Sequence, residues 1–197
     1  MSKLSRNDLL SLEQYAEHRA AFRADVMAHK ARRRIALGAN ATLVFEDRVT
    51  IQYQIQEMLR IERIFEASAI EEELAAYNPL IPDGSNWKGT LLIEYPDVAE
   101  RREALVRLRG VEHKLWVQVD GHEKVFAIAN EDMERSNDDK TAAVHFVRFE
   151  HSNAAIAAIR AGAKVHLGID HPELPYDIEL TDASLASLAA DLGVPEA

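Results

Sequence analysis

The stretch VTIQYQIQEMLRIERIF, Val49–Phe65, is the part of the chain around which the rest can be organised. At about 100° per residue, the spacing of an α-helix, its apolar side chains fall almost all the way round the axis. Ile51 and Ile55 belong to one stripe, and Val49 and Tyr53 belong to a second patch on another side. A helix that is apolar on most sides is packed on most sides. The stretch therefore predicts a central helix that is buried on several faces.

Two carboxylates interrupt this apolar surface. On the helical wheel Glu62 lies between Ile51 and Ile55, and Glu57 also lies among isoleucines. A buried carboxylate is costly unless it is paired, hydrogen-bonded, protonated or bound to a metal. We therefore predict that Glu62 is mostly buried and bonded to an Arg, His or Tyr side chain or to a metal. A structural ion pair is the favoured explanation, with the candidate partners Arg19, Arg23 and Arg148.

Composition narrows the class of protein. The formal net charge of −10 argues against sequence-independent binding of nucleic acid. The chain has no cysteine, which excludes disulfides, thiolate catalysis and Cys-ligated zinc or iron–sulfur clusters. No apolar run reaches the roughly 18 residues of a membrane span, and MSKLSRNDLL lacks the apolar centre of a signal peptide. We therefore predict a cytoplasmic protein with neither a nucleic acid nor a membrane as its partner.

The remaining patterns predict an α+β fold, in which long N-terminal helices pack on a mostly antiparallel sheet with additional helices on one face. We expect a single domain, 1–197, with a helical part over 1–77 and an α+β part over 78–197. The most secure local prediction is a hairpin over 114–129, because Asp120-Gly121 is a strong signal for a type I′ turn.

The main irregular segment is YNPLIPDGSNWK, residues 77–88, where two prolines and a glycine forbid regular structure. Many binding sites consist of polar and aromatic side chains on a loop that is held rigid. In this segment the candidate side chains are Asn78, Asn86, Trp87 and Lys88. An equally good interpretation is a rigid connector with Trp87 inserted into the core.

A polar row on the central helix suggests where this loop could close. Gln52, Gln56 and Arg60 follow one another at intervals of one turn, so they project together. We hypothesise that Gln56, Arg60 and Glu57 border one cavity with the Asn78–Lys88 segment, and that Gln52 extends the row. The alternative is a fully satisfied structural network with no cavity.

Several strings carry a resemblance to a known family: LSRNDLLSLEQY from Leu4, TLVFEDRVTIQYQIQEMLRIER from Thr42, YNPLIPDGSNW from Tyr77, KTAAVHFVRFE from Lys140 and LGIDHP from Leu167. Over essentially its full length the chain resembles an uncharacterised bacterial family, domain-of-unknown-function family 3501. Members of this family are often encoded near rubrerythrin and near an iron–sulfur protein that resembles heterodisulfide reductase. The resemblance implies a link to peroxide or redox physiology, and it implies no catalytic residue.

Common catalytic motifs are missing: the sequence has no Walker loop, GxGxxG, HExxH or GxSxG. No Glu is followed by His three residues later, so a ferritin-like di-iron site is excluded. Whether the chain is an enzyme, and its oligomeric state, stay open.

Three hypotheses remain. The favoured one is a non-catalytic accessory protein of a redox or peroxide-stress system, with an iron–sulfur or rubrerythrin-type partner. The second is a mononuclear Fe, Mn or Zn site built from Glu57 or Glu62 with His145 or His29. The third is a pocket for a small anion, formed by Arg60, Arg63 and the loop.

Overall fold

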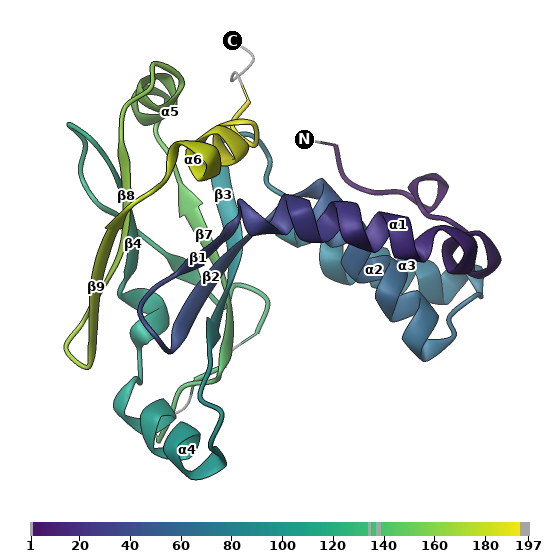
Figure 1. Cartoon of the computed structure of the whole chain (residues 1–197), viewed down its shortest axis with the longest axis horizontal. Coiled ribbons are helices and arrows are strands. Elements are labelled where there is room, and N and C mark those ends of the chain that lie inside the picture. Colours follow the sequence, from purple (N-terminus) through teal and green to yellow (C-terminus); the bar gives the residue numbers. More distant parts are fainter. Residues whose placement is uncertain (1, 134, 137–138, 194–197) are drawn as a thin grey trace.

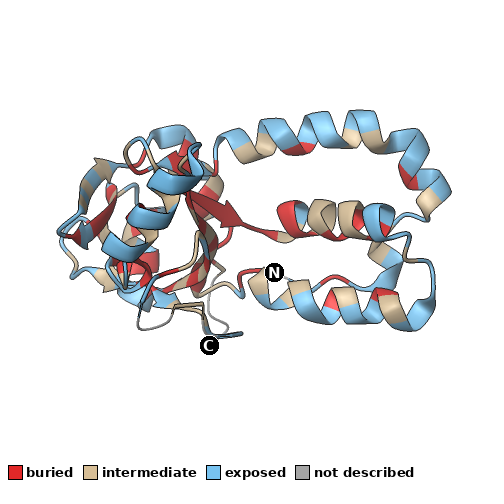
Figure 2. Ribbon diagram, turned by 90° about the horizontal axis from the view of Figure 1, so that it is seen from below, coloured by how far each residue is buried: buried red, intermediate tan, exposed pale blue. Residues whose placement is uncertain are grey.

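The computed structural model describes residues 2–133, 135–136 and 139–193. It is an α+β fold, as predicted, in which a group of helices projects from a body of antiparallel strands (Figure 1). The helical part meets the strands at one end only, and its outer surfaces are largely exposed (Figure 2). None of the helices in the described ranges is long and apolar enough to cross a membrane.

Three helices form the projecting part, which we call the helical arm: α1 (Leu12–Ala31), α2 (Arg48–Glu62) and α3 (Ala67–Tyr77). A short 3₁₀ turn, η1 (Arg6–Asp8), precedes α1. Side chains of Ser11 and Asp47 accept hydrogen bonds from the first-turn amides of α1 and α2, the usual way in which a helix start is satisfied. The arm has its own apolar core, made of Leu4, Ile51, Ile55, Leu59, Ile70, Leu74 and Ile81.

The central helix is less buried than the sequence predicts. It ends at Glu62, because Arg63 adopts a left-handed backbone conformation with φ of 55°. Ile61 is 58% exposed and Phe65 is 71% exposed. The apolar residues near the end of the stretch therefore do not mark a packed face, and the prediction of a helix buried on most sides is wrong for its last turn.

The strands form two antiparallel sheets rather than one. Sheet A has the order β1 (Arg34–Ala36), β2 (Ala41–Glu46), β3 (Asn86–Ile93), β7 (Val144–Glu150) and β6 (Ile128–Ala129). Sheet B has the order β5 (Val125–Phe126), β4 (Leu115–Val119), β8 (Val165–His171) and β9 (Leu174–Glu179).

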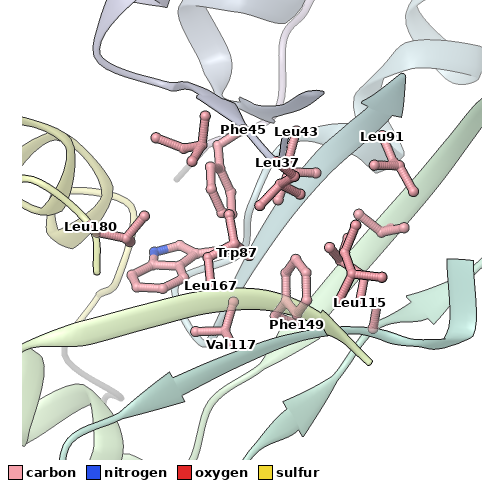
Figure 3. Close-up of a cluster of buried hydrophobic side chains, with 14 of the residues drawn as sticks. Leu37, Leu43, Phe45, Trp87, Leu91, Leu115, Val117, Phe149, Leu167 and Leu180 are labelled. Atoms are coloured by element: carbon pink, nitrogen blue, oxygen red, sulfur yellow. The ribbon is translucent and has the colours of Figure 1, made fainter. Parts of the chain in front are cut away.

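One extended segment links the two sheets. Its first half, β5, pairs with β4, and its second half, β6, pairs with β7 after the single intervening residue Ala127. The sheets consequently enclose one large core, in which Phe45, Trp87 and Phe149 of sheet A lie opposite leucines and valines of sheet B (Figure 3). The 3₁₀ turn η2 (Asn78–Leu80) follows α3 and packs on the core of the arm. Shorter helices complete the body: α4 (Val98–Arg107), η3 (Val111–His113), α5 (Asn153–Arg160) and α6 (Asp182–Ala189).

The predicted hairpin over 114–129 is confirmed, because Trp116 pairs with Phe126 and Val117 with Val125. The predicted type I′ turn is wrong. That turn requires positive φ at both central residues, whereas Gly121 has φ of 78° and Asp120 is not among the described residues with positive φ. The extra length of the connection lets a turn with a single left-handed residue close the hairpin.

Candidate functional site

A cavity of about 830 Å³ lies where the helical arm joins sheet A. We call it the arm cavity. Its walls come from α2, α3, η2, β3, β7 and the segment after β6. The lining residues are Met58, Glu73, Ala76, Tyr77, Pro79, Leu80, Asp83, Lys88, Glu131, Asp132, Phe146, Val147 and Arg148. A volume in this range is typical of sites that take small molecules or a few side chains.

The loop over 77–88 forms one wall, and its polar residues hold it in place. Asn78 makes two bonds to the backbone of Leu4: its Oδ1 accepts from Leu4 N at 2.8 Å and its Nδ2 donates to Leu4 O at 2.9 Å. Lys88 Nζ donates to the carbonyls of Pro79 at 2.8 Å and Ile81 at 3.2 Å. Asn86 Nδ2 donates to Asp83 Oδ2 at 2.8 Å. The loop is therefore a braced wall, held by bonds among its own residues and by the backbone of Leu4.

Trp87 does not face the arm cavity. It is fully buried in the core between the sheets, and its Nε1 donates to the carbonyl of Leu188 at 2.9 Å. Its backbone belongs to β3, which begins at Asn86, inside the segment that was predicted to be irregular. For Trp87 the rigid-connector interpretation holds, whereas Lys88 lines the cavity.

Most of the charges at the cavity are already paired. Arg148 holds Glu131 through two hydrogen bonds of 2.9 Å and also bonds to Glu150, and these bonds from Arg148 are the main reason that the pKa of Glu131 is lowered. Arg135 bonds to Asp132 at 2.6 Å and likewise lowers the pKa of that carboxyl. These pairs leave little free charge on this side of the cavity.

The glutamines of the central helix serve another purpose. Gln56 is fully buried, with Oε1 accepting from Leu10 N at 2.6 Å and Nε2 donating to Leu10 O at 3.3 Å. Gln52 Nε2 donates to Asp8 O at 2.6 Å. The two side chains clamp the segment before α1 onto α2. For Gln52 and Gln56, the alternative prediction of a satisfied structural network without a cavity therefore holds.

Glu57 is the carboxylate of the central helix that is held by partners. It accepts from Tyr15 Oη at 2.6 Å, from Arg19 at 2.7 and 2.9 Å and from Arg60 at 3.1 Å. The bonds from Arg19 are the main reason that the pKa of Glu57 falls to about 2. Only Met58 of α2 lines the arm cavity, so the prediction that Gln56, Glu57 and Arg60 border it is wrong.

Glu62 is exposed, so the prediction that it is mostly buried is wrong. The wheel placed it between two buried isoleucines, but it lies at the last turn of α2, beyond the part that other elements cover. The ion pair expected for Glu62 occurs at Glu57 instead, and Arg19 is its partner.

The two predicted metal-binding histidines occupy different sites. His29 Nε2 lies 2.5 Å from Asp47 Oδ2 at the junction of α1 and α2. His145 is fully buried in sheet A, with Nε2 2.8 Å from Thr141 Oγ1 and Nδ1 3.2 Å from Asn130 Oδ1. Over the described ranges no three His, Asp or Glu side chains come together in a way that could hold a metal ion.

Sequence reasoning missed a buried carboxylate beside His145. Glu112 has no exposed surface, and its Oε2 lies 3.9 Å from His145 Nε2. Burial pulls the pKa of Glu112 up, but hydrogen bonds, led by that from Ser136, bring it below its ordinary value. Burial lowers the pKa of His145. A buried carboxylate held by two hydroxyls beside a neutral imidazole stabilises this end of the body, and no sequence motif marks it.

His151 is a second buried group that the sequence did not single out. It is 5% exposed, its ring centroid lies 4.4 Å from that of Trp87, and neither ring nitrogen has a hydrogen-bond partner among the described residues. Burial lowers its pKa to about 4. The native state therefore keeps this imidazole neutral at pH values where the unfolded chain protonates it.

We expect that pH dependence to show in the stability of the protein. Because the pKa of His151 is lowered on folding, its contribution is complete above about pH 6.5 and is lost as the pH falls toward 4. Between pH 7.5 and pH 5 the wild type should lose about 2 kcal/mol more than His151→Phe in urea unfolding. The exposed control His18→Phe should behave as the wild type does. If His151→Phe and the wild type lost the same free energy of unfolding between these pH values, His151 would not be the cause of the pH dependence.

Comparison with known proteins adds a family but no activity. The family described as "Protein of unknown function (DUF3501)" matches residues 3–192. A crystal structure of a "novel protein of unknown function" from Burkholderia pseudomallei K96243 superposes with a TM-score of 0.93 at 49% sequence identity. The match covers 97% of this chain and all of that one. No curated protein matches. The chain belongs to the DUF3501 family of proteins of unknown function.

Proposed function

We propose that this chain is a non-catalytic binding protein that holds a segment of a partner protein in the arm cavity. The observation that supports this proposal is the cavity itself, whose apolar lining includes Met58, Leu80 and Phe146. None of its described lining residues is His, Ser or Thr, and Lys88, Glu131 and Asp132, which could act as nucleophiles, are held by partners within the protein. Binding is therefore the chemistry that the lining favours.

The class of partner comes from the family resemblance. The resemblance implies that members of the family are often encoded near rubrerythrin and near a heterodisulfide-reductase-like iron–sulfur protein, so these two are the first candidates, in a redox or peroxide-stress system. A cysteine-free chain is suited to the cytoplasm, where such systems work.

The small-anion alternative has one supporting observation, the presence of Lys88 and Arg148 in the lining. Both cations already bond to groups of the protein. Lys88 donates to two carbonyls, and Arg148 holds two carboxylates. An anion would have to displace these partners, which makes this alternative the weaker one.

The test is direct binding between the purified full chain and each candidate partner, measured by calorimetry. Phe146→Asp places a charge in the apolar wall and should weaken binding at least tenfold. Val144→Asp is the matched control, because it lies two residues earlier on the same face of β7, is exposed and is outside the lining. If neither candidate binds the wild type, the redox-partner proposal is wrong. If Phe146→Asp binds as the wild type does, the arm cavity is not the docking site.

A further inference from the structure

Two neighbouring side chains of α3 stand out among the polar groups that line the arm cavity. Glu73 and Tyr77 are four residues apart on one helix, so they project side by side. Both are partly buried. Within the described ranges, neither the Glu73 carboxylate nor the Tyr77 hydroxyl has a hydrogen-bond or ion-pair partner in the protein.

The other charged lining residues differ in this respect. Glu131 and Asp132 are held by Arg148 and Arg135, and Asp83 accepts hydrogen bonds from Ser85 and Asn86. Lys88 and Arg148 are themselves occupied, as described above. The lining has four acidic and two basic residues, and Glu73 is the acidic one whose carboxylate has neither a hydrogen-bond nor an ion-pair partner in the described part of the chain. The negative charge of Glu73 on α3 is therefore the one that a cation from outside the protein could neutralise.

The surroundings of Glu73 suit a cation carried on an apolar stem. Tyr77 supplies an aromatic ring and Met58 a thioether to the same lining, whereas the ring of Phe146 is already covered by the guanidinium of Arg135, which lies 4.5 Å from its centroid. Aromatic faces attract ammonium and guanidinium groups, and the methylene stems of Lys and Arg pack on apolar surface. A carboxylate beside such rings forms a stronger pair than one in open water, because part of its hydration is removed.

We propose that the partner segment enters the arm cavity with a lysine or arginine side chain, whose charge is held by Glu73 and Tyr77 while its apolar neighbours contact Met58, Leu80 and Phe146. This inference rests on the proposed function and names the chemistry of the partner. The net charge of −10 on the chain favours a basic partner over an acidic one.

The first test uses the protein partner identified by calorimetry and two variants of α3. Glu73→Gln removes the charge but keeps the shape, and it should weaken binding about tenfold. Glu72→Gln is the control, because Glu72 is the adjacent residue, is exposed and does not line the cavity. Added salt should weaken binding of the wild type more than that of Glu73→Gln. If Glu73→Gln binds the partner as tightly as Glu72→Gln does, the proposal that the partner places a cation at Glu73 is wrong. Should Phe146→Asp still abolish binding in that case, the docking function stands.

The second test asks what carries the cation, and it uses fluorescence anisotropy of the full chain. The probes are labelled nine-residue apolar peptides that differ only at the central position, which is Lys, norleucine or Glu. The Lys peptide should bind at least tenfold more tightly than the norleucine peptide, and the Glu peptide should bind least. Equal binding of the three peptides, or none to the wild type, would overturn the inference. Displacement of the Lys peptide by hexylamine at equal concentration would show a small-amine site and overturn a polypeptide occupant.

Discussion

Arg33→Met is expected to lower the free energy of unfolding by about 3–5 kcal/mol, the usual effect of removing one member of a buried ion pair. Arg33 is 1% exposed. Its guanidinium donates to the carbonyls of Phe45 at 3.0 Å and Glu46 at 3.1 Å, and it bonds to the buried carboxylate of Asp191. Arg33 also donates to the carbonyl of Ser187 in α6 at 3.1 Å, so these bonds fasten α6 to the point where α1 passes into β1. The methionine would fill most of the space but leave the carboxylate without a cation.

The matched control is Arg34→Met. The side chain of Arg34 is about half exposed and pairs with Glu94 at 3.1 Å, so its loss should cost under about 1 kcal/mol. Urea unfolding of both variants and the wild type measures the difference. A similar, small loss for both variants would show that Arg33 does not fasten α6.

The pH dependence of Arg33→Met gives a second check. Burial raises the pKa of Asp191 to about 6 despite the attraction of Arg33. A raised pKa means that the native state binds this proton more tightly than the unfolded chain, so stability is lost as the pH rises through 6. Without Arg33 the cost of ionising Asp191 grows. The loss caused by Arg33→Met should therefore be larger at pH 8 than at pH 5.

Arg33 also shows why sequence reasoning could not find this ion pair. Lys30 and Arg32–Arg34 are typical of the C-terminal turn of a helix, where cations complement the dipole, so a local explanation accounts for Arg33 without a buried partner. The carboxylate that Arg33 holds is 158 residues away. Nothing in a single sequence connects such positions. The basic residues mark the end of α1, which is at Ala31, but the long-range partner needs the structure.

Local signals predicted the elements well where one signal was sufficient. Ser152 caps α5 at the start of an alanine-rich run, and the predicted Asp120-Gly121 hairpin is present. The division into two sheets was not predictable in this way. It depends on one extended segment that pairs with β4 before Ala127, as β5, and with β7 after it, as β6. Each of these strands has two residues, which is too short for a periodicity from which the change of partner could be inferred.

Sequence reasoning predicted the candidate site only in part, because a helical wheel carries limited information about burial. The loop wall and Lys88 belong to the arm cavity, and Gln56 is buried, as its surroundings suggested. Periodicity shows which residues share a helix face, but it does not show how far along the helix the covering elements extend. Glu62 and Ile61 lie past that limit. Glu73 and Phe146 come from separate elements that only the fold brings to one cavity.

Gly168→Ala is expected to cost about 3 kcal/mol or more, at the upper end of the effects of overpacking. A Cβ atom at Gly168 of β8 would lie 2.2 Å from Cζ2 of Trp116 and 2.4 Å from the carbonyl oxygen of Tyr176. The indole cannot move freely, because its Nε1 donates to Asp170 at 2.7 Å and Lys124 Nζ lies 3.8 Å from the ring centroid. The carbonyl belongs to the paired strand β9, so the sheet itself would have to shift.

The control for this prediction is Gly121→Ala, which tests backbone strain without a clash. Gly121 has φ of 78°, but nothing lies within 4 Å of a Cβ there, so the expected cost is about 1–2 kcal/mol. In thermal and urea unfolding, Gly168→Ala should be much less stable than Gly121→Ala. The near-ultraviolet circular dichroism spectrum of Gly168→Ala should also change, because Trp116 is displaced. A Gly168→Ala variant as stable as Gly121→Ala would mean that sheet B can open by more than an ångström at its centre. The four strands could not then pack as closely on Trp116 as the described contacts require.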